Sequence, residues 1–141
     1  MHENAGNIGM RIPQYKFLIK NLQVNILSMA YRGYSYSDEV EPTEEGLKKD
    51  ADAIADFLQN PAEVDEEVAQ HINKQLIFSH GRSLGGAVAI YMVEKNQHLF
   101  RGMIIENTFT SISAMADEMF PFLKPIKPYI LRIGWYSDEL I

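Results

Sequence analysis

Apolar positions along the chain follow two spacings, and each spacing predicts a different kind of element. Short continuous apolar runs have the length of buried strands, whereas apolar side chains that recur every three or four residues are typical of helices with one buried face. The runs that predict strands cover residues 24–30, 75–80 and 102–106. The helical spacing predicts helices at residues 12–20, 44–59 and 84–96. Because strands and helices alternate, we expect α/β architecture, with a mainly parallel sheet flanked by helices.

The helix expected at residues 44–59 has clear end signals. Thr43 is a suitable N-cap, and the acidic residues Glu44 and Glu45 complement the helix dipole in the first turn. Asn60 and Pro61 end the pattern, since the residue before a proline is pushed out of the helical region. The side chains that mark its buried face are Leu47, Ala51, Ile54, Ala55 and Leu58.

The remaining segments are irregular by this criterion. Residues 31–42 form a loop rich in glycine and tyrosine, and the acidic residues 62–74 are expected to be a surface insertion. Residues 107–113 contain hydroxyl side chains that suit the start of a helix reaching residue 119. The apolar segment 120–141 is interrupted by prolines and is expected to be a lid-like or tail segment. At 141 residues, the chain 1–141 is long enough for one core and too short for two ordinary domains.

Composition narrows the classes of partner. A net charge of −6 argues against binding to the phosphate backbone of nucleic acid or to anionic lipid. The sequence contains no cysteine, which excludes disulfides and thiolate metal sites and favours a non-secreted protein. Neither the glycine spacing of a dinucleotide loop nor a Gly-Lys-Ser/Thr phosphate loop is present, which disfavours a nucleotide-binding domain. We therefore expect neither a cofactor nor a metal ion.

The strongest chemical signal is the sequence Gly81-Arg82-Ser83-Leu84-Gly85 between an expected strand and an expected helix. Glycines two residues before and after a serine allow a tight strand-to-helix turn, in which the serine is held in a strained conformation with its hydroxyl exposed. The amide of Leu84 lies in the first helical turn and has no intrahelical acceptor, so it is available to an oxyanion. The pattern predicts that Ser83 is an acyl-accepting nucleophile.

Four motifs, in order, resemble the α/β-hydrolases. They are HENAGNIG at residues 2–9, YRGY at 31–34, GRSLGGAVA at 81–89 and ENTF at 106–109. Together they are similar to the group of α/β-hydrolase domain-containing protein 13, which implies a serine hydrolase of carboxylic esters or thioesters, including acylated proteins. The resemblance implies that the amides of Leu84 and Asn4 form the oxyanion hole. It also implies that any membrane contact comes through segments absent from this sequence.

The chain departs from the family pattern at three positions. Glu3 replaces a glycine beside Asn4, where an inward-facing carboxylate would oppose a developing negative charge. Ala30 replaces an aspartate, and Ser35 replaces a loop glycine. These departures affect the expected loop geometry rather than the expected fold.

The partners that a nucleophilic serine needs are not evident. The histidines at positions 2, 71, 80 and 98 all have structural interpretations, and none is predicted to be the catalytic base. Glu106, at the end of an expected strand, is either the triad acid or an anchor of the following turn. We expect an internal piece of a longer enzyme, which lacks the strand before the oxyanion loop and the C-terminal strands, and which is inactive alone. The competing hypothesis is a non-catalytic binding or scaffold protein of the same fold.

Overall fold

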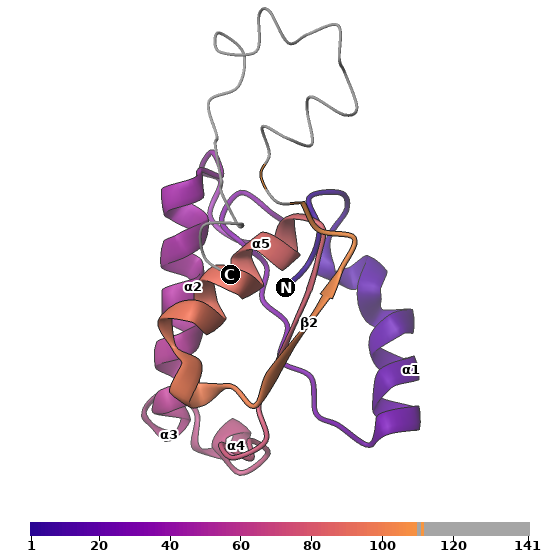
Figure 1. Ribbon diagram of the computed structural model, residues 1–141, viewed down its shortest axis with the longest axis vertical. Coiled ribbons are helices and arrows are strands. Elements are labelled where there is room, and N and C mark those ends of the chain that lie inside the picture. The colour runs from indigo at the N-terminus through magenta and orange to yellow at the C-terminus, as the bar shows by residue number, and fades with distance from the viewer. Residues whose placement is uncertain (110, 112–141) are drawn as a thin grey trace, which may run out of the picture.

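The computed structural model describes residues 1–109 and 111, and Figure 1 shows how their elements are arranged. A two-stranded parallel sheet lies at the centre, with α5 packed on it and α2 packed on α5 (Figure 1). The helix α1 lies on the other side of the strands (Figure 1). The α/β fold class with helices flanking a parallel sheet is thereby confirmed. The elements are η1 Ile8–Arg11, α1 Ile12–Leu22, α2 Glu44–Gln59, α3 Pro61–Val64, α4 Glu66–Ala69, β1 Phe78–Arg82, α5 Leu84–Lys95, η2 Gln97–Leu99 and β2 Gly102–Glu106.

Helix α2 agrees with its end signals. The Thr43 side chain accepts a hydrogen bond from the amide of Gly46, which caps the first turn. The helix ends at Gln59, immediately before Asn60. Its predicted apolar face packs on α5, and this contact forms the core. The buried core residues are Tyr31, Leu47, Ala51, Ala55, Leu84, Ala87, Val88 and Met92.

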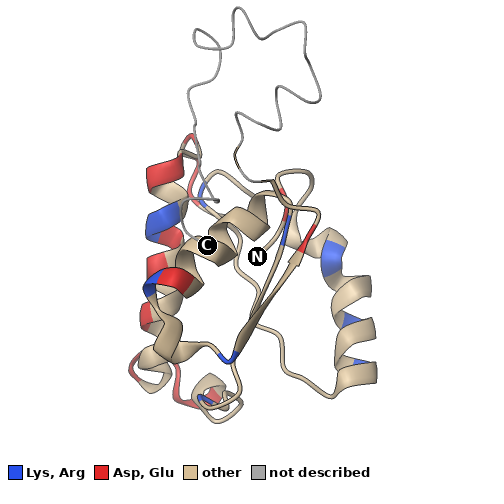
Figure 2. Ribbon diagram, viewed as in Figure 1, with Lys and Arg blue, Asp and Glu red and all other residues tan. Residues whose placement is uncertain are grey.

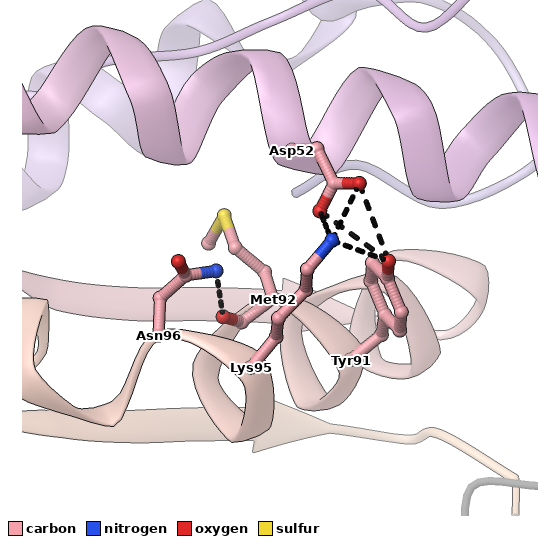
Figure 3. Close-up of polar contacts among 5 residues, drawn as sticks. All are labelled: Asp52, Tyr91, Met92, Lys95 and Asn96. Atoms are coloured by element: carbon pink, nitrogen blue, oxygen red, sulfur yellow. Dashed lines mark hydrogen bonds and ion pairs between the residues drawn. The ribbon is translucent and has the colours of Figure 1, made fainter.

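A polar cluster joins the same two helices at the surface (Figure 3). Asp52 on α2 accepts hydrogen bonds from the ammonium of Lys95 at 2.8 and 2.9 Å and from the hydroxyl of Tyr91 at 3.3 Å. The amide side chain of Asn96 donates to the carbonyl of Met92 at 3.0 Å, which satisfies one free carbonyl at the end of α5. The contacts of Asp52 therefore join α5 to α2 at the surface, and α5 begins at the serine turn.

The two strands pair in register from Phe78 with Gly102 to Arg82 with Glu106. The prediction for residues 102–106 is confirmed, and α1 begins at Ile12 as predicted. The first strand begins later than predicted and runs to Arg82, because residues 73–76 form a turn in which the Leu76 amide donates to the Asn73 carbonyl.

The prediction of a strand at residues 24–30 is wrong. This segment has no regular secondary structure, and Val24 and Leu27 are exposed. An apolar run forms a strand only if a neighbouring strand takes up its backbone groups, and no strand in the described part of the chain lies beside it. The prediction rested on the apolar run alone, and such a run does not reveal whether another strand lies beside it.

Residues 62–74 contain the end of α3 and the single-turn helix α4, and their side chains are almost all exposed. Their assignment as an insertion stays a prediction. The helix expected to reach residue 119 and the lid-like segment 120–141 lie outside the described residues. Charge is unevenly placed along the chain (Figure 2): acidic residues outnumber basic ones in α2, whereas the charged residues of α1 are all basic. Glu3 is the only acidic residue among the first 37.

Candidate active site around Ser83

Ser83 joins the last residue of β1 to the first residue of α5 in an unusual backbone conformation. Its φ is 52° and its ψ is −122°, which is a sparsely populated region for a residue with a side chain. The turn is fixed on both sides, because the Ser83 amide donates to the carbonyl of Glu106 at 2.9 Å and its carbonyl accepts from the hydroxyl of Thr108 at 2.8 Å. The side chain is half-buried. This is the geometry of a strained serine at a strand-to-helix turn.

The flanking glycines make the turn possible by allowing close approach. A Cβ on Gly81 would collide with the carbonyl of Gly85 and stand 2.8 Å from the Cβ of Ala89. A Cβ on Gly86 would collide with the side chain of Thr108. Strand, helix and following loop therefore approach one another more closely than larger residues would permit.

The amide of Leu84 begins α5, a helix of 12 residues. Among the described residues no acceptor lies against this amide, which stands at the positive end of the helix dipole. A hydroxyl and a free amide are thus adjacent in the chain, as acyl transfer to Ser83 would require.

The N-terminal segment lies beside the same turn. The Met1 amine donates to the carbonyl of His80 at 2.5 Å, and the amide of Arg82 donates to the carbonyl of Met1 at 3.3 Å. Alternate residues of a strand point their backbone groups to opposite edges, so Met1 lies on the edge of β1 away from β2. A Cβ on Gly85 would stand 2.6 Å from the carbonyl oxygen of His2, which places the loop that carries Asn4 against the start of α5.

His2 is a buried structural residue. Its ring lies 4.2 Å from that of Tyr31, between centroids, and its Nδ1 bonds the carbonyl of Glu3 at 2.8 Å. Its Nε2 accepts from the amide of Tyr31 at 3.5 Å. Burial lowers the pKa of His2 below the usual 6.5, because a charged ring would lose its hydration. The neutral ring of His2 therefore joins the N-terminal loop to Tyr31.

Glu3 does not stand as an isolated charge. Its carboxylate pairs with the guanidinium of Arg11 and lies 3.9 Å from Nε of Arg82, with the Glu3 side chain only 14% exposed. Asn4 is exposed, and its side-chain oxygen accepts from the hydroxyl of Tyr34. Spacing gave no sign of the Glu3–Arg11 pair, which joins a loop to the helical turn η1 that follows it.

The other departures from the family pattern are accommodated. Ser35 adopts the left-handed φ of 55° where the family pattern has glycine, so the loop keeps its shape at the cost of some strain. The carbonyl of Ala30 accepts a hydrogen bond from the Ser37 hydroxyl at 3.0 Å.

The structure does not join a histidine to Ser83 within the described residues. Nε2 of His80 lies 3.2 Å from a carboxylate oxygen of Glu106, so the candidate acid is occupied by a strand neighbour. His71 and His98 are exposed. The His80–Glu106 pair follows from the strand register, in which His80 and Glu106 lie on the same face of neighbouring strands.

Other site chemistries find little support in residues 1–109 and 111. That part of the chain holds no group of three or more acidic or histidine side chains arranged for a metal ion. It also has no helix with the length and apolar character needed to cross a bilayer.

Comparison with known proteins finds relatives, among them one named as an α/β-hydrolase domain-containing protein. The chain is 40% identical over 122 residues to alpha/beta hydrolase domain-containing protein WAV2 of Arabidopsis thaliana, a match that covers 86% of the chain and 37% of that protein. It is 38% identical to protein bem46 of Schizosaccharomyces pombe, over 99% of the chain and 44% of the relative. It is 39% identical to the uncharacterized membrane protein YNL320W of Saccharomyces cerevisiae, over 98% of the chain and 45% of the relative. The chain thus spans less than half the length of these relatives. No protein-family model matches it, and no solved structure does.

Proposed function

The chain is a homologue of the α/β-hydrolase domain proteins, and on that premise we propose that it carries the nucleophile of a serine hydrolase. In this proposal, Ser83 accepts the acyl group of a carboxylic ester or thioester. The amides of Leu84 and Asn4 donate hydrogen bonds to the oxyanion of the tetrahedral intermediate. The intermediate expels the alcohol or thiol of the substrate and leaves the acyl group on Ser83, and water then hydrolyses this acyl-enzyme to a carboxylic acid and free Ser83. Neither a metal ion nor a cofactor takes part.

The observation that carries the proposal is the conformation of Ser83. A serine with φ of 52° is costly, by about 1–3 kcal/mol, and such strain persists only where the surroundings impose it. Here the glycines Gly81 and Gly85 and the bonds to Glu106 and Thr108 impose it. The strain favours a hydroxyl set apart from the sheet and the helix, beside the unpaired amide of Leu84.

A serine hydroxyl also needs a base, and the base an acid. All four histidines of the sequence lie among the described residues, and none of them hydrogen-bonds to Ser83. The proposal therefore places the acid and the base of the triad outside this chain, in the complete protein. Glu106 is the weaker alternative for the acid, since His80 already binds it.

Substrate and membrane contact belong to the same proposal. A small ester or thioester, or an acyl group on a protein, fits a nucleophile of this kind. The relative named as a membrane protein supports membrane contact of the complete protein through segments absent from this chain.

Labelling with a fluorophosphonate probe tests the proposal on the complete protein. The probe should modify Ser83, and the adduct should disappear in Ser83→Ala. Ser79→Ala is a matched control, because Ser79 is on β1 and buried at 4% exposure, and its replacement should leave labelling unchanged. A folded complete protein that forms no adduct would instead support the non-catalytic binding or scaffold function.

A further inference from the structure

The N-terminal loop that carries Asn4 has few bonds that fix its backbone. Asn4, Ala5 and Gly6 are exposed and have no regular secondary structure. Their conformation depends on side chains that reach in from elsewhere in the chain. An amide that donates to an oxyanion has to be held within about 0.5 Å of its productive position. These side chains therefore decide whether the amide of Asn4 can serve as an oxyanion donor.

The side chain of Arg11 contacts the residues on both sides of Asn4. The guanidinium of Arg11 pairs with the carboxylate of Glu3, and the same nitrogen donates to the carbonyl of Ala5 at 3.0 Å. Glu3 and Ala5 flank Asn4, so Arg11 ties the two sides of Asn4 together. Both partners are largely shielded from water, with side-chain exposures of 20% for Arg11 and 14% for Glu3. A shielded pair of this kind is held more firmly than an exposed one.

The pair also removes an electrostatic conflict. A lone Glu3 carboxylate beside the proposed oxyanion donor would oppose the charge that develops during acyl transfer. With Arg11 in contact and Arg82 at 3.9 Å, the surroundings of Glu3 carry two positive charges against one negative charge. Because Glu3 is the only acidic residue among the first 37, Arg11 has no competing acid nearby in sequence.

We propose that Arg11 is a positioning residue, whose guanidinium neutralises Glu3 and ties it to Ala5 so that the intervening amide of Asn4 is held toward Ser83. This inference rests on the proposed hydrolase function. It makes Glu3 the anchor for the Arg11 guanidinium, whereas the family pattern alone suggests that Glu3 disturbs the oxyanion hole.

Steady-state hydrolysis of p-nitrophenyl butyrate by the complete protein tests the inference. Arg11→Met should lower kcat by about tenfold and leave KM within about twofold, since the contact acts on the transition state. The double variant Glu3→Gly/Arg11→Met removes the orphaned carboxylate but leaves the loop untied, so it should recover kcat only in part. Arg101→Met is the matched control at the other end of the sheet, where the arginine is exposed, and should behave as wild type.

Three results would overturn the inference: an unchanged kcat in Arg11→Met, a rise in KM alone, or full recovery in the double variant. If Arg11→Met does not fold, Arg11→Lys keeps a positive charge near Glu3, but the shorter side chain with its single ammonium no longer bonds both Glu3 and the carbonyl of Ala5 as the guanidinium does. It should lower kcat several-fold, and a wild-type kcat would overturn the inference equally. Failure of the hydrolase function is distinct, because wild type itself would then neither label at Ser83 nor hydrolyse the ester.

Discussion

Replacing Gly81 by alanine is the sharpest test of how the serine turn is built. The new Cβ would meet main-chain atoms of Gly85 and stand 2.8 Å from the Cβ of Ala89, so the strand or the helix has to move. Overpacking of this kind costs about 1–3 kcal/mol, and we expect the upper end, because main chain cannot rotate aside as a side chain can. At about 1.4 kcal/mol per factor of ten, the folding equilibrium should fall by about a hundredfold.

Urea denaturation of the complete protein, followed by circular dichroism, measures this cost. Gly102→Ala is a matched control, because its Cβ would stand 3.2 Å from the ring of Phe78, which is exposed and free to turn away. Neither glycine has a positive φ, so the difference between the two variants isolates the close approach at the turn. A Gly81→Ala cost no larger than that of Gly102→Ala would refute the reasoning. The same variant should label more slowly with a fluorophosphonate, because Ser83 would shift.

Three further predictions concern the loops and helix ends. Ser35→Gly should raise the free energy of unfolding by about 0.5 kcal/mol, since relief of a left-handed φ outweighs the extra chain entropy of glycine; a loss of stability in urea would contradict this. Thr43→Ala should lower it by about 1 kcal/mol through loss of the bond to the Gly46 amide, and an unchanged urea midpoint would show that the cap contributes nothing. Because burial lowers the pKa of His2, the folded state resists a proton that the unfolded state accepts, so stability should be full above about pH 6.5 and fall below it. An NMR titration of the His2 ring with a midpoint at or above 6.5 would contradict the last.

Helix α2 was predicted correctly because its cap and its buried face are set by neighbours in sequence. Thr43 caps α2 because its own side chain reaches the amide three residues on, and the apolar face of α2 follows from helical spacing. Residues 24–30 were predicted wrongly because a strand is defined by its partner. Val24 and Leu27 fit a strand in composition, yet nothing in their own stretch of sequence reveals whether another strand lies beside them.

The candidate site divides along the same line. The conformation of Ser83 follows from five consecutive residues, because two glycines and a chain reversal leave few alternatives. The pairing of His80 with Glu106 could be obtained only after the strand register was known. The Glu3–Arg11 pair could be predicted neither from the serine motif nor from the strand register. Glu3 lies in an irregular loop, and such a loop has no repeating spacing that predicts which side chains meet.

Glu3 illustrates why a departure from a family pattern must be judged in three dimensions. By sequence alone, a carboxylate in place of glycine suggests a damaged oxyanion hole or a protein that has lost catalysis. Glycine is not required there for backbone reasons, because Glu3 is not among the described residues with a positive φ. The remaining objection is the negative charge of Glu3, and the positive guanidiniums of Arg11 and Arg82 lie beside that carboxylate and offset its charge. The replacement is therefore compatible with an oxyanion hole, and loss of activity need not follow from it.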